Sequence, residues 1–380
     1  MRTSENNLLL VANWDSSTGY AWRLMEGFWI MLAVHWCQAG KEAYLVYPSI
    51  SDIPKKIRVS SIKVDAIDFK RGDITSLLKQ YRYIADNQVT TIYLSDYPGY
   101  YWRYIIYRLA GAKHIIVHNH APGMRSRPGV VKRLLKKLAY KLPGMSADGI
   151  IGATDYVRKR NIEIGCAPEA KCYSAPNGVA EQMDSQAENI KERYKIPVEK
   201  KILVTTSRAN KYKGIEFALE VLAFLIKDRK VNNLHYLFCG DGPDIDSFRQ
   251  KAAQLKIEDK VTFAGYVKNV YPLLLSCDMA IHPSNGEVGY SLSILEYMQA
   301  GLPVIVPDNP SVCGATLDAT DGLIYKEGDV RDAAEKIEQL LDQPELAREM
   351  GEQAKKRIAD EYMLANTHTK LLEAVASIIK

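Results

Sequence analysis

The strongest constraint on the fold is an alternation of two patterns that runs along the chain of 380 residues. Short apolar runs typical of strands alternate with longer stretches of helical periodicity. In the first half, strands are expected at Leu8–Asn13, Ala43–Tyr47, Thr91–Ser95, His114–His118, Gly149–Ala153 and Cys172–Ala175. In the second half, they are expected at Ile202–Thr206, His235–Cys239, Val261–Ala264, Met279–His282, Pro303–Val306 and Leu323–Tyr325. Strands that alternate with helices form parallel sheets covered on both faces, so the sequence predicts an α/β fold.

The same pattern indicates two domains. Helices are expected between the strands, for example at Trp22–Ala39, Ile74–Asn87 and Tyr101–Ala110, and from Val330 to the end. The turn signal Pro176-Asn177-Gly178 is followed by a polar stretch at 180–200 that has no strand pattern. We therefore expect Rossmann-like domains over 1–178 and 179–362, with a helix over 363–380 that packs back on the first domain. Because doubly wound sheets bind ligands at the carboxyl ends of their strands, the expected site is the cleft between the domains.

Composition excludes several classes of protein. Apolar residues make up 47% and charged residues 25%, as in soluble globular proteins. The six cysteines form no C-x-x-C pair, which predicts buried, reduced thiols, and with the seven histidines they form no zinc-ligand pattern. The run Leu8–Ala12 is too short for a signal peptide, and no apolar run approaches the roughly 18 residues that cross a bilayer. We expect a cytoplasmic protein.

The net charge of +5 conceals an uneven distribution. Residues 1–180 hold 25 basic and 14 acidic side chains, a net of +11, which leaves −6 for the remainder. Residues 125–142 hold seven cations and no acid, and a helical wheel separates their apolar and basic side chains. Such a helix fits an anionic membrane surface, so the chain is expected to be peripheral on the inner membrane face. The alternative is that the apolar side packs on its own sheet. We expect no nucleic-acid partner, because no such motif is present and the charge is concentrated in one helix.

Two loops of the second half carry residues suited to an anionic ligand. The first loop, 206–214, follows a strand and opens a helix, and it holds Arg208 and Lys213. A guanidinium and an ammonium near a helix N-terminus suit a diphosphate. The second loop runs from Pro283 into a helix that is expected to begin near Ser291, with Glu287 before that helix and Glu296 within it. Carboxylates can accept hydrogen bonds from sugar hydroxyls while free backbone N–H groups hold phosphate.

Six short motifs, kept in order and at family spacing, together resemble glycosyltransferase family 4, whose members are retaining enzymes of the GT-B fold that use nucleotide sugars. The motifs are P-N-G-V at 176–179, R-x4-K-G at 208–214, C-G-D-G-P at 239–243, A-G-Y-V at 264–267, the segment from Glu287 to Glu296, and A-G-L-P-V at 300–304. The resemblance covers nearly the whole second half and is fainter in the first.

The resemblance implies roles for particular residues. Arg208 and Lys213 would hold the donor diphosphate, Glu296 the ribose and Glu287 the donor sugar. Backbone near Gly265, Tyr266 and Val267 would frame the base, and the donor would also contact Gly19 and the segment Gly289, Tyr290, Ser291 and Leu292. A histidine at the end of the strand 114–118 would lie close to the transferred sugar, and the register favours His120, with His118 as the alternative.

The chain departs from the family pattern in three places. Eight residues separate Glu287 from Glu296 where the family has seven, so Glu287 fills the first-glutamate role only if the loop carries one extra residue. The usual G-F-G-L-P reads Gly289-Tyr290-Ser291-Leu292-Ser293, and the first-domain Gly-Gly loop reads Ser17-Thr18-Gly19.

The expected function is hexosyl transfer (EC 2.4) with retention, from a nucleotide-diphosphate sugar to a glycan or lipid-linked acceptor in cell-surface polysaccharide or glycolipid synthesis. Family frequency favours UDP over GDP. The reaction is expected to need no metal and no cofactor, because Arg208, Lys213 and the helix N-terminus can stabilise the departing diphosphate. The alternatives are a sugar-nucleotide epimerase of similar fold and a non-catalytic relative that only binds the nucleotide sugar.

Overall fold

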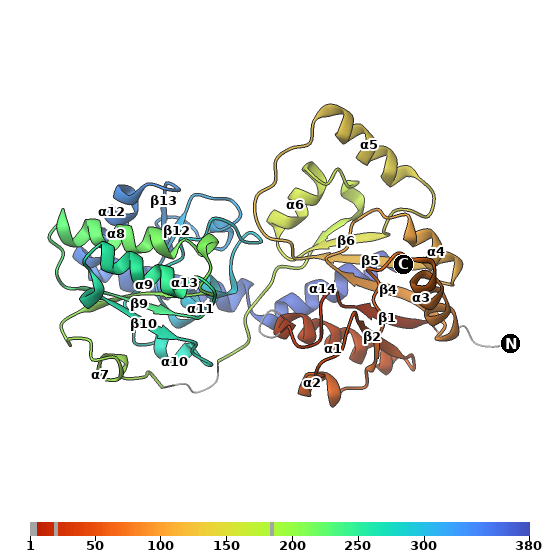
Figure 1. Cartoon of the computed structure of the whole chain (residues 1–380), viewed down its shortest axis with the longest axis horizontal. Coiled ribbons are helices and arrows are strands. Elements are labelled where there is room, and N and C mark those ends of the chain that lie inside the picture. The colour runs from red at the N-terminus through yellow and green to blue at the C-terminus, as the bar shows by residue number, and fades with distance from the viewer. Residues whose placement is uncertain (1–5, 19–21, 183–185) are drawn as a thin grey trace. The chain divides into compact units, whose positions relative to one another are not determined.

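The computed structural model describes residues 6–18, 22–182 and 186–380, and it divides the chain into two compact units (Figure 1). Unit 1 comprises Met1–Ala121, Arg125–Pro176 and Thr367–Lys380, and unit 2 comprises Pro122–Met124 and Asn177–Asn366. The last helix therefore packs with the first unit. The hydroxyl of Thr367 donates to the carbonyl of Pro176 at 2.8 Å, and the side chain of Ile378 fills the space beside Gly149.

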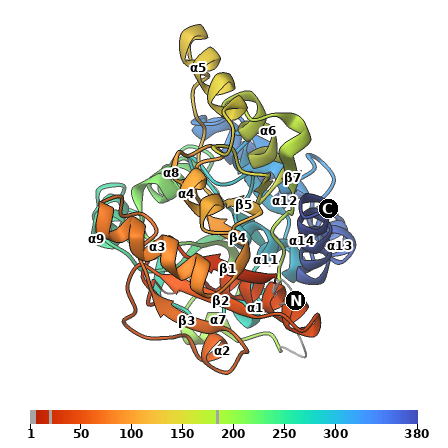
Figure 2. The same ribbon diagram turned by 90° about the vertical axis from the view of Figure 1, so that its right-hand side faces the viewer.

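Unit 1 is built on a parallel sheet of seven strands in the order β3-β2-β1-β4-β5-β6-β7. The strands are β1 (Asn7–Val11), β2 (Ala43–Tyr47), β3 (Lys63–Ala66), β4 (Val89–Ser95), β5 (His114–Asn119), β6 (Gly149–Gly152) and β7 (Cys172–Ser174). The helices are α1 (Trp22–Gln38), α2 (Lys55–Arg58), α3 (Ile74–Asp86), α4 (Arg103–Leu109), α5 (Val130–Lys141), α6 (Asp155–Glu163) and α14 (Leu364–Ile378). Leu9 and Val11 of β1 share a buried cluster with Ile84 of α3 and Tyr107 of α4, which covers one face of the sheet (Figure 2).

Unit 2 repeats the plan with six parallel strands in the order β10-β9-β8-β11-β12-β13. The strands are β8 (Lys201–Thr206), β9 (Leu234–Cys239), β10 (Val261–Gly265), β11 (Met279–Ile281), β12 (Val304–Pro307) and β13 (Gly322–Tyr325). The helices are α7 (Ile190–Arg193), α8 (Ile215–Lys227), α9 (Ile245–Gln254), α10 (Tyr271–Leu274), α11 (Leu292–Ala300), α12 (Val330–Asp342) and α13 (Pro344–Glu361).

The central strand β8 shows why its sheet is covered on both sides. Leu203 packs into a buried cluster with residues of α8, α9 and α12, whereas Ile202 and Val204 pack into a second cluster with residues of α11 and α13. Successive side chains of a strand point to opposite faces, so an uninterrupted apolar run needs a helical layer on each face.

In each sheet the strand order reverses once, between β1 and β4 and between β8 and β11. The loops that leave the carboxyl ends of two such neighbouring strands diverge and leave room for a ligand. In unit 2 these are the loops after Thr206 and after Ile281, which hold the charged residues singled out in the sequence.

The predicted α/β class is confirmed, and the twelve predicted strands lie within two residues of observed ones. Strand β3 was missed. It is an edge strand whose residues are exposed or half-buried, so its sequence carries no apolar alternation, and only its backbone pairing with β2 defines it.

The six cysteines are all free, as predicted, but only Cys166, Cys172 and Cys239 are buried. Within the described ranges, no helix has both the length and the apolar character that crossing a membrane requires.

Candidate functional site

The loop after β8 carries two cations, Arg208 and Lys213. Arg208 is exposed, and residues Lys211–Lys213 form a turn of 3-10 helix that ends at Gly214, where α8 begins. Gly214 has a φ of +72°, and a Cβ atom at this position would lie 1.9 Å from the carbonyl oxygen of Pro283. Only glycine allows both this conformation and this approach, which brings the β8 loop against the β11 loop.

The loop after β9 supports the β8 loop from its other side. A Cβ on Gly240 would lie 1.8 Å from the carbonyl oxygen of Ser207. Ala209 donates its N–H to the carbonyl of Asp241 at 2.9 Å, and Lys211 donates its N–H to the Asp244 carboxylate at 2.9 Å. Gly240, the first glycine of the C-G-D-G-P motif, therefore allows the backbone packing that fixes the loop of Arg208.

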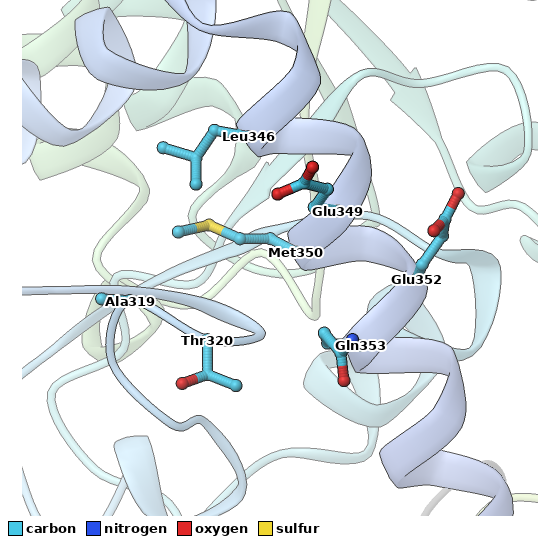
Figure 3. A pocket seen from close by; sticks show the side chains of 7 residues that line it. All are labelled: Ala319, Thr320, Leu346, Glu349, Met350, Glu352 and Gln353. Atoms are coloured by element: carbon cyan, nitrogen blue, oxygen red, sulfur yellow. The ribbon is translucent and has the colours of Figure 1, made fainter.

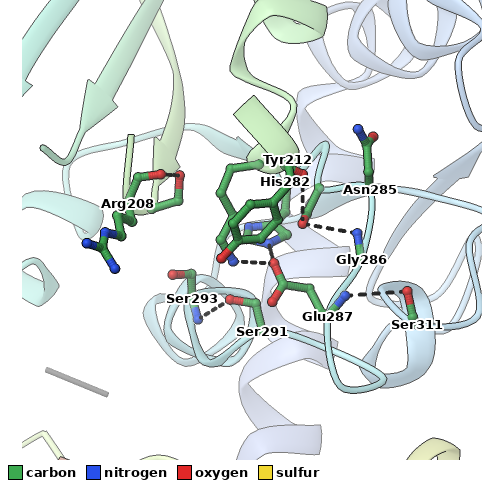
Figure 4. A network of polar contacts seen from close by, with 12 residues as sticks. Arg208, Tyr212, His282, Asn285, Gly286, Glu287, Ser291, Ser293 and Ser311 are labelled. Carbon is green, nitrogen blue, oxygen red and sulfur yellow. Dashed lines mark hydrogen bonds and ion pairs between the residues drawn. The ribbon is translucent and has the colours of Figure 1, made fainter. Parts of the chain in front are cut away.

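The charged groups of the two loops meet in a buried network (Figure 4). Lys213 Nζ lies 2.5 Å from Glu287 Oε1, and His282 Nε2 lies 3.1 Å from the same oxygen. Glu287 is buried, although an acidic residue on a loop before a helix is commonly exposed. Oε2 of Glu287 accepts no hydrogen bond from any residue that the structure describes, which leaves it able to accept one from a ligand hydroxyl.

The network fixes the protonation of both acid–base groups. Burial alone would raise the pKa of Glu287, but the hydrogen bond from His282 and the charge of Lys213 lower it to about 2. Burial lowers the pKa of His282, although Glu287 opposes the shift. At neutral pH the carboxylate is therefore charged, and a neutral imidazole donates to it from Nε2.

Arg208 lies to one side of this network, and its guanidinium takes part in none of the contacts drawn in Figure 4. The two predicted diphosphate ligands thus differ, because Lys213 is only 12% exposed and is neutralised by Glu287, whereas Arg208 is exposed. Arg208 and backbone N–H groups are therefore the sources of positive charge that this region leaves open to solvent.

Those N–H groups belong to the start of α11, which begins where it was predicted. Ser291 is the N-cap, and its hydroxyl accepts from the N–H of Ser293 at 3.2 Å. Tyr290 is buried and donates its hydroxyl to the carbonyl of Asn177 at 2.8 Å. The side chain of Tyr290 is therefore part of the domain interior, and its contact with the donor stays a prediction. Gly289 and Leu292 flank this start.

The remaining predicted residues of unit 2 lie at neighbouring strand and helix ends. Glu296 is half-buried, one turn into α11. Gly265 ends β10, and its carbonyl accepts from the N–H of Gly240 at 2.8 Å, which ties this end to the β9 loop. Tyr266 follows with a ring that is 63% exposed, and Val267 is half-buried.

In unit 1 the two candidate histidines differ sharply in surroundings. His118 lies inside β5 without exposure, and its Nδ1 is hydrogen-bonded to the hydroxyl of Tyr93. His120 lies just beyond the strand end. Its backbone N–H donates to the Asp96 carboxylate at 2.5 Å, and its side chain is 16% exposed. Burial lowers the pKa of both imidazoles, and Asp96 opposes the shift at His120. His120 is therefore the less enclosed of the two, although both of its ring nitrogens are buried, and it is a neutral imidazole.

The loop after β1 contains an organising residue that the sequence analysis missed. Asp15 accepts hydrogen bonds from the hydroxyls of Ser17 at 2.7 Å, Ser49 at 2.7 Å and Ser51 at 3.0 Å. The Ser17 and Ser49 bonds hold the pKa of Asp15 well below its usual range. An Asp followed by Ser two residues later is the signal that could have indicated this turn. Gly19, the predicted phosphate contact, lies outside the described residues.

A surface hollow of about 290 Å³ lies elsewhere, between the turn at Ala319 and Thr320 and helix α13 (Figure 3). The seven residues that line it include two glutamates and no cation. It therefore does not suit an anionic diphosphate.

No group of three or more His, Cys, Asp or Glu side chains within 6–18, 22–182 and 186–380 is arranged to hold a metal ion.

Sequence comparison agrees with this geometry. The family model described as glycosyl transferases group 1 matches residues 186–357, which contain both loops of the unit 2 site. This part of the chain is a group 1 glycosyltransferase domain. The alpha-monoglucosyldiacylglycerol synthase of Streptococcus pneumoniae is 28% identical over 271 residues, which cover 69% of this chain and 59% of that protein. The chain thus spans less than two thirds of that relative.

Solved structures extend the likeness to both domains. A glycosyltransferase from Rickettsia africae has a TM-score of 0.79 at 17% identity, with all of both chains covered. HepE of Anabaena, solved in complex with UDP, has a TM-score of 0.76 at 15% identity over 98% of this chain and 100% of that chain. The two sheets of this chain therefore form the predicted GT-B fold.

The close approach at Gly240 gives a testable consequence. Gly240→Ala places a methyl group against the Ser207 carbonyl and should lower the free energy of unfolding by about 1–3 kcal/mol, as overpacking does. The matched control is Gly27→Ala inside α1, where the nearest atom would be 4.0 Å away and the free energy of unfolding should rise by about 0.5–1 kcal/mol. Calorimetry measures the free energy of unfolding of both variants. Equal values for the two would show that the Gly240 backbone contact does not exclude a side chain.

The lowered pKa of Glu287 predicts a pH-dependent contribution to stability. A carboxylate with a depressed folded-state pKa stabilises fully above its ordinary pKa and loses that effect as the pH falls toward about 2. Glu287→Gln should therefore lower the free energy of unfolding by about 3 kcal/mol at neutral pH, with a difference that shrinks below about pH 5.

Urea unfolding across this pH range measures the effect. The control is Glu352→Gln, which breaks an exposed ion pair with Arg348 and should change stability by less than about 0.5 kcal/mol. A Glu287→Gln difference that stays constant down to low pH would mean that this carboxylate is not held ionised by its neighbours.

Proposed function

We propose that this chain transfers a sugar, with retention, from a nucleotide-diphosphate sugar to a glycan or lipid-linked acceptor. One observation carries the proposal: Arg208, Lys213, Glu287 and the start of α11 converge at the point where the strand order of the second sheet reverses. This is where doubly wound domains bind nucleotides.

Each group has a role that its surroundings support. The exposed guanidinium of Arg208 would bind the diphosphate, together with the first N–H groups of α11. Lys213 would hold Glu287 in place and add charge beside the phosphates, and Glu287 Oε2 would accept from a hydroxyl of the donor sugar. Glu296, one turn further along α11, would accept from the ribose, and the exposed ring of Tyr266 would face the base.

The reaction would proceed by attack on the face from which the diphosphate leaves. The acceptor oxygen bonds to the anomeric carbon as the bond from that carbon to the diphosphate oxygen breaks. A phosphate oxygen of the leaving group takes the acceptor proton. No protein nucleophile is needed, and the rate depends on how well Arg208 and the N–H groups of α11 stabilise the departing diphosphate. These groups would do so without a metal ion or other cofactor.

Relatives support the choice of substrates. The name of the Streptococcus pneumoniae relative describes a synthase of a glucosylated diacylglycerol, and Anabaena HepE binds UDP. We therefore propose a UDP-sugar as the donor, ahead of a GDP-sugar, and cell-surface polysaccharide or glycolipid synthesis as the context.

Nucleotide-induced thermal stabilisation tests the donor. A nucleotide at 100 times its dissociation constant adds about 2.7 kcal/mol to the free energy of unfolding. UDP, GDP and ADP are compared, and the UDP-sugar is then incubated with and without acceptors. Conversion without any acceptor would indicate an epimerase, and binding without transfer or hydrolysis would indicate a non-catalytic relative.

Arg208→Ala should lower turnover by about 10²–10³, the loss expected for one preorganised stabiliser of developing charge. Stability should be nearly unchanged because Arg208 is exposed. Arg348→Ala removes an exposed arginine from the same domain and serves as the control. Lys213→Ala is a poorer test, because it also leaves Glu287 buried without its cation. Near-normal turnover of Arg208→Ala would remove this account of the leaving group.

His120→Ala should lower transfer about tenfold, the effect of losing one hydrogen bond, with little change in UDP affinity. His118→Ala should instead lower stability, because it leaves the buried hydroxyl of Tyr93 without its partner. Steady-state kinetics and thermal unfolding of both variants separate the two effects. Full activity of His120→Ala would show that this histidine does not contact the transferred sugar.

A further inference from the structure

Helix α5 is amphipathic, but its apolar side is not packed against the protein. Its apolar side chains are between 48% and 86% exposed. They are Val130, Val131, Leu134, Leu135, Leu138 and, just past the helix end, Leu142. No residue of the helix is buried. This overturns the alternative that the apolar side packs on its own sheet.

The contacts of α5 with its own domain come from the opposite side. Lys136 donates to the carbonyl of Ile164 at 2.8 Å, at the end of α6. Tyr140 packs on Tyr100 with a ring distance of 4.9 Å, and with Lys136 and Ala139 it makes up the half-buried part of the helix. Figures 1 and 2 both show α5 at the margin of its domain, beyond α6.

At about 100° per residue, the apolar side chains occupy an arc of about 140° that faces away from these three contact residues. The helix is thus held by one side and presents the other to solvent. An ordinary surface helix has the reverse arrangement, with its apolar side toward the core.

Charge indicates what covers this face. Lys137 lies just outside one edge of the apolar arc, Lys141 lies just inside that edge, and Lys132 follows the other edge. No carboxylate occurs within residues 125–142. Glu163 of α6 pairs with Arg127 before the helix, outside the apolar face. Long cationic side chains at the borders of an apolar face can reach lipid phosphates while the apolar groups enter the interface.

We propose that α5 docks the first domain on an anionic lipid bilayer. The apolar side chains would insert at the level of the headgroups, and the flanking lysines would bind lipid phosphates. Together with the proposed function, on which this step rests, the docking makes the acceptor a lipid-linked molecule of the same membrane surface. Docking itself requires neither donor nor acceptor.

The test is sedimentation of the full chain with phosphatidylcholine vesicles that contain or lack phosphatidylglycerol, at low and moderate salt. We expect pelleting only with the anionic vesicles, weakened by salt. Lys132→Gln with Lys137→Gln should lower the partition constant about 30-fold, and Leu134→Gln with Leu138→Gln should abolish pelleting.

Matched controls come from the same domain. Lys55→Gln with Lys56→Gln removes two exposed cations of α2, and Ile74→Gln with Leu78→Gln removes two exposed apolar side chains of α3 at the same spacing as Leu134 and Leu138. Both should pellet as the parent chain does. Thermal unfolding of each variant verifies that it folds.

Two results would overturn the proposal. One is equal and negligible pelleting with both kinds of vesicle. The other is a dimer by light scattering that becomes monomeric in Leu134→Gln with Leu138→Gln, because a second copy would then cover the face. A chain that pellets but transfers no sugar would refute the proposed function alone, and a chain that transfers sugar to a water-soluble acceptor but does not pellet would refute only the docking.

Discussion

The site in the second domain depends on the close approach of three loop backbones. The β8 loop is packed between the β9 loop and the β11 loop. The carbonyl oxygen of Ser207 occupies the space that a Cβ on Gly240 would take, and that of Pro283 occupies the space of a Cβ on Gly214. Backbone contacts of this kind leave little freedom for adjustment. They hold the β8 loop, which carries Arg208 and Lys213, and the start of α11 in one arrangement, which is what a preorganised binding site requires.

Within that frame, charge is distributed unequally. Glu287 neutralises Lys213 in a buried network that also includes His282. The ion pair therefore fixes the positions of these side chains but adds little net charge to the site. Arg208 is exposed, so its charge is open to solvent. A buried pair of this kind is costly to break from either side, which ties the stability of the domain to the integrity of the site.

The exposed surface of the first domain also depends on how one element is attached to it. Helix α5 is attached through Lys136 and Tyr140 and leaves its apolar side uncovered. The sequence showed that the two sides of this helix differ in chemistry. It could not show which side faces the protein, because an amphipathic wheel is equally consistent with an apolar side that packs on a sheet.

The sequence by itself determined the α/β class, the positions of twelve strands and the loops that carry the charged residues, because periodicity and turn chemistry are local properties. It did not reveal the edge strand β3, whose existence depends on pairing with β2. Only the tertiary structure decided that Glu287 is buried against Lys213, that Tyr290 points into the interior, and that His118 is fully buried while His120 is partly exposed. Those properties depend on segments far apart in the chain, and a local pattern carries no information about which of them meet.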